Sequence, residues 1–490
     1  MCRPPGRAAR IPFALQRDRC AKRPYRNRPR EAEPDYMFAR KDAEANDHGR
    51  GIAGWAVVAL VFMPFAAGYF LSYLFRTING VVSARLAAEL GLNAADLGLI
   101  TAVYFLVLAA AQIPVGVMLD RYGPRRVQSV LLLIAAFGAA AFARSTGPLS
   151  LLMARAVIGL GVAAALTAGL KAIVLWFPRE RVALVNGYMV MLGALGAVAA
   201  TLPAEAVLAK TGWRDLFDIL AVTTAGTAIL IFFLVPERDV EASSAAAGGG
   251  LRAILADRRF WKIAPLSGGC IGSAWSMQGL WAPAWLTDVE GMTRTEVVTA
   301  LCATAIVLSL GAWLLGMIAS WTRRKGIRRE TLLALVAVLF ILAQLALVLR
   351  LPLPSIGPWL MIAIVGSATV LSFAIVSDYF PKEMAGRANG VLNVVHFGWG
   401  FLAQYGTGLL VAHWAQQDGH YPAVAYQVAF GVNVALQTAA LAWFAISRGR
   451  HATRKSDDRF SFALYEDFDD LGSYSEQPVL IEEPVAQGKW

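Results

Sequence analysis

Part of the sequence occurs twice, at a separation of roughly 200 residues. The matching segments are 91–98 with 291–298, 116–126 with 316–329, and 176–187 with 379–390. A single insertion of about three residues accounts for the spacing of all three matches, so duplication explains them better than chance. A repeat of this length in an apolar chain predicts two halves with the same fold.

The starts of two corresponding helices support the duplication. Asn93 with Asp96, and Thr293 with Glu296, have the spacing of a capping box, in which each side chain accepts from the other residue's backbone N–H. We expect both pairs to tie down the first amides of a helix at the membrane surface, and we assign them a structural role.

The composition places both halves in a lipid bilayer. Residues are 57% apolar and only 16% charged, whereas soluble domains carry about 25% charged residues. Twelve apolar stretches are long enough to cross about 30 Å of hydrocarbon, and we expect helices because backbone groups inside a bilayer must satisfy one another. The stretches fall near 55–82, 95–118, 125–143, 150–176, 182–206, 214–235, 263–286, 296–320, 329–349, 358–380, 386–412 and 423–446.

The sequence therefore predicts an all-α integral membrane protein with twelve transmembrane helices in two pseudo-symmetric six-helix bundles. Outside the bundles we expect a basic, disordered tail, a Gly/Ser-rich linker and an acidic tail, all cytoplasmic. The boundaries are 1–50 for the basic tail, 51–236 for the first bundle, 237–262 for the linker, 263–448 for the second bundle and 449–490 for the acidic tail.

The placement of charge sets the expected orientation. The net charge is +11, and the loops on the side of the N-terminus hold seventeen Lys and Arg residues against six on the opposite side. Loops rich in Lys and Arg face the cytoplasm, so both termini are expected there, in a bacterial inner membrane. A nucleic-acid partner would need a basic patch on a soluble domain, and the sequence contains no such domain.

Neither a cofactor nor a metal is predicted. The four cysteines lack the spacing of a zinc site or a disulfide framework. No GxxxxGK phosphate-binding loop occurs, which argues against ATP hydrolysis within this chain.

The loop that follows the second expected helix carries a dense motif of glycine, acid and arginine. Its residues are Gly116, Asp120, Arg121, Gly123, Pro124, Arg125 and Arg126. The motif resembles the signature loop of the major facilitator superfamily, and Arg155, Gly159 and Gly161 resemble the family's second, weaker signature. We expect Gly116 to permit close helix approach and Asp120 to cap a helix of the opposite bundle. At the repeat position of Asp120 the second half has Ser320, which lacks a carboxylate. We therefore expect the corresponding contact made by the second half to be weaker.

The resemblance implies a secondary transporter in which two bundles rock about a central site, driven by a gradient of a coupling ion such as H⁺ or Na⁺. The signature-loop residues Gly116, Asp120, Arg121, Gly123, Arg125 and Arg126 are the expected gate between its two end states.

The first helix has a polar stripe centred on Arg76, with Ser72, Tyr73 and Asn79 on the same face. A charged residue inside a span is costly, and such residues usually face the bundle interior and work there. The segment SYLFRTING resembles family members that carry organic phosphates and carboxylates, where an arginine meets the anion. The repeat position holds Ser276, which leaves one fixed charge and favours a small organic monoanion or an anion that enters together with a cation. The alternative is that Arg76 anchors the helix at a membrane face.

Further candidates for the substrate site are single polar or aromatic residues on other helices. Gln278 and Trp281 share one face of the seventh expected helix, Asn393 lies within the eleventh, and Arg155 either lines the cavity or pairs internally.

Two rival functions stay open at the level of the sequence. The same fold serves exporters of neutral or hydrophobic compounds, and a non-transporting membrane sensor or assembly factor is a third possibility. An enzyme is not expected, because no nucleophile–base arrangement or carboxylate pair converges within the spans.

Overall fold

The computed structural model describes residues 54–237, 249–354 and 356–452. The expected basic tail at 1–50 and nearly all of the acidic tail at 449–490 lie outside the described residues. Apart from an isolated bridge between Gln417 and His420, the regular structure within these ranges is entirely helical.

The first half, residues 54–237, begins with a nearly continuous helical span and continues through long bent helices. Its elements are α2 (Gly54–Val57), η2 (Val58–Phe62), α3 (Met63–Thr77), α4 (Asn79–Leu90), α5 (Ala94–Ala143), α6 (Pro148–Gly161), α7 (Ala165–Trp176), α8 (Arg179–Ala199) and α9 (Leu202–Leu234).

The second half, residues 249–452, repeats this plan. Its elements are α10 (Gly249–Ala256), α11 (Arg258–Ser276), η3 (Met277–Trp281), α12 (Ala282–Asp288), α13 (Arg294–Arg324), α14 (Arg329–Val348), α15 (Ile356–Gly366), α16 (Thr369–Tyr379), α17 (Lys382–Val411) and α18 (Ala423–Ala452). Helix α10 and the start of α11 fall within the range 237–262 that was expected as linker.

Glycines in the left-handed region fold two of the long helices back on themselves. Helix α5 has 50 residues and turns at Gly123 (φ 77°, ψ 163°), and α9 turns at Gly212 (φ 88°, ψ 174°). A single span needs only about 20 residues, so α5 is long enough to cross twice. Eight described helical stretches are long and apolar enough to cross a membrane, two of them with 50 and 51 residues. The number of twelve crossings is compatible with these lengths and stays a prediction.

Both predicted capping boxes are present. The N–H of Asp96 donates to Oδ1 of Asn93 at 3.0 Å, and the N–H of Asn93 donates to Oδ2 of Asp96 at 3.1 Å. In the second half the N–H of Thr293 donates to Oε2 of Glu296 at 2.8 Å. The two halves therefore start these helices with the same local chemistry.

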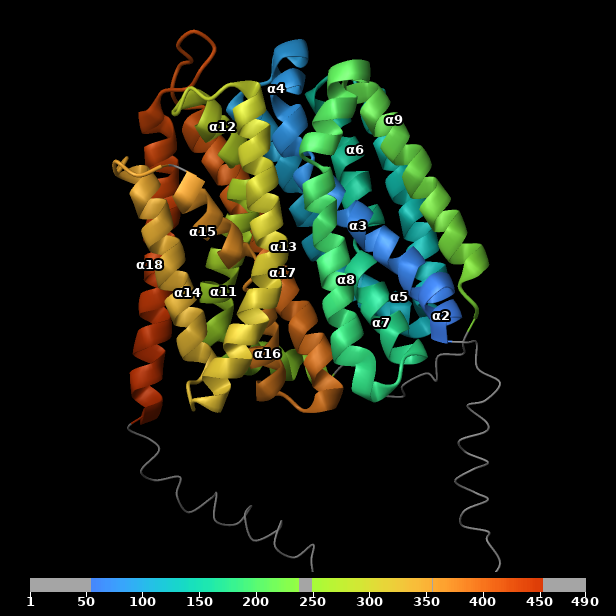
Figure 1. Ribbon diagram of the computed structural model, residues 1–490. Coiled ribbons are helices and arrows are strands. Elements are labelled where there is room, and N and C mark those ends of the chain that lie inside the picture. Colours follow the sequence, from blue (N-terminus) through green and yellow to red (C-terminus); the bar gives the residue numbers. More distant parts are fainter. Residues whose placement is uncertain (1–53, 238–248, 355, 453–490) are drawn as a thin grey trace, which may run out of the picture. The chain divides into compact units, whose positions relative to one another are not determined.

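Figure 1 shows the beginning of α2 and the end of α18 at one end of the helices, with α4 and α12 reaching the other end. We call these the terminal end and the far end. At the far end α5 and α17 approach closely, since a methyl group built on Gly98 would lie 3.2 Å from the Cα of Gly408. The N–H of Ala94 also donates to the hydroxyl of Tyr421 at 3.1 Å. The two halves are therefore tightly joined at the far end.

The glycines of the two signature motifs have different surroundings. A methyl group on Gly159 would lie 3.0 Å from the carbonyl oxygen of Tyr104, whereas one on Gly116 would meet nothing within 4 Å. Close helix approach was expected at Gly116 and is not found there, because the space beside that residue is open.

We predict that Gly161→Ala destabilises the first half. The new methyl group would lie 2.2 Å from the backbone nitrogen of Ala135, so α5 and α6 must separate to admit it. Overpacking of this kind costs about 1–3 kcal/mol, and thermal unfolding in detergent should show a lower midpoint. Gly116→Ala is the matched control and should unfold at the wild-type temperature. Equal midpoints for the two variants would contradict the packing role of Gly161.

Candidate functional site

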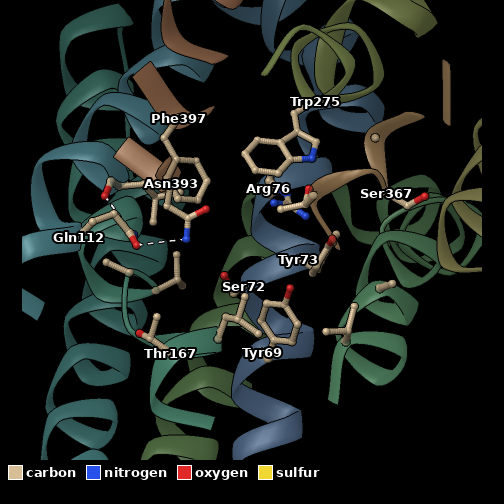
Figure 2. A pocket seen from close by; sticks show the side chains of 18 of the residues that line it. Tyr69, Ser72, Tyr73, Arg76, Gln112, Thr167, Trp275, Ser367, Asn393 and Phe397 are labelled. Atoms are coloured by element: carbon tan, nitrogen blue, oxygen red, sulfur yellow. Dashed lines mark hydrogen bonds between the residues drawn. The ribbon is translucent and has the colours of Figure 1, made fainter. Parts of the chain in front are cut away.

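A central cavity lies between the two halves, and Figure 2 shows its polar side chains. It encloses about 1040 Å³ of space, part of which is open to solvent. Helices α3, α5, α7 and α8 of the first half and α11, α13, α16 and α17 of the second contribute to its wall. Its polar and aromatic lining residues are Tyr69, Ser72, Tyr73, Arg76, Tyr104, Gln112, Thr167, Trp275, Ser367, Thr369, Phe373, Asn393 and Phe397.

Arg76 supplies the charge of this cavity. Among the described lining residues it is the only one with a formal charge, and no ion pair in the described part of the chain involves it. Its Cζ lies 3.7 Å from the ring centroid of Tyr73 and 4.9 Å from that of Trp275. Aromatic faces attract a guanidinium while leaving its N–H groups available. The half-buried guanidinium of Arg76 therefore faces the cavity and lies between Tyr73 of the first half and Trp275 of the second half.

Neutral hydrogen-bonding groups surround this cation. The hydroxyl of Tyr104 donates to the carbonyl of Ser72 at 3.1 Å and holds α5 against α3. Across the cavity, Nδ2 of Asn393 donates to Oε1 of Gln112 at 3.5 Å, the dashed line between those residues in Figure 2. Because Gln112 belongs to α5 and Asn393 to α17, this long hydrogen bond links the two halves beside the cavity.

The wall also includes two helix breaks at corresponding places in the repeat. Residues 162–164 separate α6 from α7, and residues 367–368 separate α15 from α16. In each break the backbone forms hydrogen bonds that span three residues instead of the four of an α-helix. Examples are the N–H of Ala163 donating to the carbonyl of Leu160 and the N–H of Ser367 donating to the carbonyl of Ile364. Broken helices free backbone groups from the helical ladder beside the cavity.

Four of the predicted substrate residues line the cavity, namely Ser72, Tyr73, Arg76 and Asn393. The other four lie outside its lining. Arg155 is 1% exposed, donates to the carbonyl of Phe75 at 2.9 Å and packs near the rings of Tyr104 and Phe142. It is therefore paired within the first half, as one of the two alternatives proposed.

The remaining three lie nearer the far end. Nδ2 of Asn79 donates to Oγ1 of Thr101 at 2.8 Å, and Nε2 of Gln278 donates to the carbonyl of Ile362 at 3.1 Å. Trp281 is only 2% exposed. None of the three borders the central cavity.

The signature loop lies at the terminal end and makes its contacts within the first half. Nζ of Lys171 contacts Oδ1 of Asp120 at 2.6 Å and the carbonyl of Leu119 at 2.8 Å. A contact between Asp120 and the opposite bundle was expected, but among the described side chains this carboxylate is held by Lys171 of α7. The side chain of Ser320 lies outside what the structure describes.

The arginines of the same loop are held by the end of α9. Nε of Arg125 donates to the carbonyl of Phe232 at 2.8 Å, and both Arg125 and Arg126 pair with Glu237. Arg121 lies over the ring of Tyr122, with Cζ 5.3 Å from its centroid. These contacts tie the turn at Gly123 to the first half.

At the far end, by contrast, an ion pair joins the halves. Nη2 of Arg294 on α13 donates to Oε2 of Glu205 and to the carbonyl of Val81, both at 2.5 Å. Arg85 also contacts Glu205, at 3.3 Å. The side chain of Glu205 is only 18% exposed, which limits screening by water and salt. The far end is thus closed by packing and by charge.

Two repeated helical halves around a central, polar cavity form the architecture of a membrane transporter. Residues 65–404 match the family model of the Major Facilitator Superfamily. The match spans more than half of the chain, so the protein belongs to this superfamily, and the predicted family and helical fold are confirmed.

Curated relatives are similar over different shares of their length. The chain is 27% identical over 368 residues to the hexuronate transporter of Escherichia coli K12. This match covers 69% of the chain and 83% of that transporter. The chain is 25% identical over 246 residues to the probable sulfoacetate transporter SauU of Cupriavidus necator. This match covers 47% of the chain and only 57% of that transporter.

Among solved structures, a bacterial homologue of the human lysosomal transporter Spinster, in an inward-facing and occupied conformation, has a TM-score of 0.67. It is 17% identical, and the match covers 81% of this chain and 98% of that one. At this identity the likeness shows the fold alone.

We predict that Arg294→Ala loosens the far end. Losing a charged, partly buried contact of about 1–2 kcal/mol should raise the open population about 5- to 30-fold. Hydrogen–deuterium exchange should then accelerate in α4 and at the start of α13. Arg144→Ala breaks an ion pair with Asp218 inside the first half and should leave these segments unchanged. Wild-type exchange rates in Arg294→Ala would show that this ion pair does not hold the halves together.

Proposed function

We propose that the protein is a secondary active transporter that moves a small organic anion across the membrane by alternating access. The observation that carries the proposal is the Arg76 guanidinium, which faces the central cavity without an ion-pair partner among the described residues. The similarity to the hexuronate transporter and the probable sulfoacetate transporter supports an organic acid as the substrate.

The anion binds by pairing with the planar fork of donors on Arg76. Tyr73 and Trp275 hold the guanidinium from the two halves, so a bound anion is shared by both. The ion pair cancels the single charge of the cavity, which lowers the cost of enclosing it in a low-dielectric site. Neutral groups on Ser72, Gln112 and Asn393 then bind the hydroxyl groups of a sugar acid or the oxygens of a sulfonate.

The signature loop acts as the gate at the terminal end in this proposal. Asp120 and Lys171 lock α5 to α7, and Arg125 and Arg126 lock the turn at Gly123 to Glu237. Gly116 and Arg121 complete the gating set. Coupling of the substrate to H⁺ or Na⁺ is carried over from the family resemblance as part of the proposal.

The location proposed is a bacterial inner membrane with both termini in the cytoplasm. The domain plan comprises bundles at 51–236 and 263–448, the linker at 237–262, and tails at 1–50 and 449–490. The excess of Lys and Arg in the terminal-end loops supports this orientation.

We predict that substrate affinity depends on the shape as well as the charge of Arg76. Arg76→Ala should abolish binding of galacturonate or sulfoacetate, measured by calorimetry on purified protein. Arg76→Lys keeps the charge and loses the fork, which should cost about 1–3 kcal/mol. Arg144→Ala removes an equal charge at an exposed position and serves as the control. Wild-type affinity in Arg76→Ala would make Arg76 an anchor and would overturn the anion assignment.

We also predict the sidedness of the protein. In a variant whose native cysteines are replaced, a cysteine at position 250 should resist an impermeant thiol reagent in intact cells, and a cysteine at position 417 should react. Permeabilised cells provide the control, since both positions should react there. The reverse pattern in intact cells would invert the orientation.

A further inference from the structure

Four buried side chains between the cavity and the far end have polar atoms without a hydrogen-bond partner among the described residues. They are Oδ1 of Asn79, Oγ of Ser276, Nε1 of Trp281, and both amide atoms of Gln404. Each of these side chains is at most 3% exposed. We call this set the far-end polar seam.

The register of the helices places the seam on the far side of the cavity. Asn79 follows Arg76 by one turn, and Trp281, the last residue of η3, follows Trp275 of α11. Gln404 follows Phe397 along α17 in the same direction, toward Gly408 at the far end. Every member therefore succeeds a cavity-lining residue on the way to the closed end.

The seam lies where the halves meet. A methyl group on Gly98 would lie 3.2 Å from the carbonyl of Gln404 and 3.6 Å from the Trp281 ring. Asn79 reaches Thr101, one turn from Gly98 on the same helix. Helices α4 and α5 of the first half thus converge with η3 and α17 of the second.

Burying such groups without partners is costly. An unpaired polar group in a protein interior costs about 1–3 kcal/mol, and an apolar side chain of similar shape would avoid the cost. Each such group needs an explanation, and at a contact that must open a partner in the other conformation provides one. Alternating access requires the halves to part here, and the parted surface would carry these groups.

We propose that the far-end polar seam is an outer substrate subsite, exposed when the far end opens. It has no charge, since Ser276 occupies the repeat position of Arg76. It therefore binds the neutral, hydroxyl-bearing part of an organic anion, with Trp281 donating, Asn79 accepting and Gln404 doing both. The anion then proceeds to Arg76. This inference rests on the proposed transport function.

The chain provides matched controls for a test. Gln128 has two unpaired amide atoms and is fully buried, but it packs against Gly68 within the first half. Trp359 has an unpaired indole nitrogen and packs against Phe430 within the second half. Neither lies where the halves separate, so neither should meet substrate.

The experiment compares Trp281→Phe and Gln404→Leu with Trp359→Phe and Gln128→Leu. Galacturonate uptake from the far-end side gives a KM, and calorimetry on purified protein gives the Kd of the central cavity. Both seam variants should raise the KM about 3- to 10-fold, the value of one hydrogen bond, with the Kd within about twofold of wild type. Both controls should keep the wild-type KM and Kd.

A wild-type KM in Trp281→Phe, with Arg76-dependent binding intact, would overturn the outer subsite and leave the proposed function standing. Galacturonate and sulfoacetate binding that does not depend on Arg76 would overturn the proposed function itself. If Gln404→Leu fails to fold, Trp281→Phe decides alone, because it removes one N–H and keeps an aromatic ring.

Discussion

The cost of holding a guanidinium inside a membrane governs this structure. Arg76 cannot lose its charge, and the protein stabilises it with the rings of Tyr73 and Trp275. Because these rings belong to opposite halves, the cation lies at the interface that transport must open and close. In the proposed mechanism a bound anion completes the pairing that the aromatic rings provide only in part, and substrate binding is then coupled to the contact between the halves.

The two ends of the interface are built differently. At the far end, Gly98 and Gly408 allow backbone contact, and Arg294 bonds across to Glu205. At the terminal end, Asp120 is held by Lys171 within its own half. An ion pair thus joins the two halves at the far end, whereas the ion pair of Asp120 at the terminal end lies within the first half. Transporters with this architecture work by rocking of the two halves as bodies about the central site.

The sequence predicted what repeats or recurs with helical period. The duplication predicted the matching capping boxes at Asn93 and Thr293. The polar stripe of the first helix predicted that Ser72, Tyr73 and Arg76 line the central cavity. Gln112, Thr167 and Ser367 were not predicted, because a single polar residue in an apolar helix does not show which face of the helix lines a cavity; Asn393 was proposed only because it lies within a span. The Asp120–Lys171 pair was also missed, since periodicity says which face a residue takes and not which helix lies opposite.

The central claim concerns charge, and it is tested most directly by varying the charge of the ligand together with Arg76. The affinities of galacturonate and its uncharged amide would be measured for wild type and for Arg76→Ala. The account predicts that wild type prefers the acid at least tenfold, about 1.4 kcal/mol, and that Arg76→Ala loses this preference and binds the acid no better than the amide. The same preference in both proteins would contradict it.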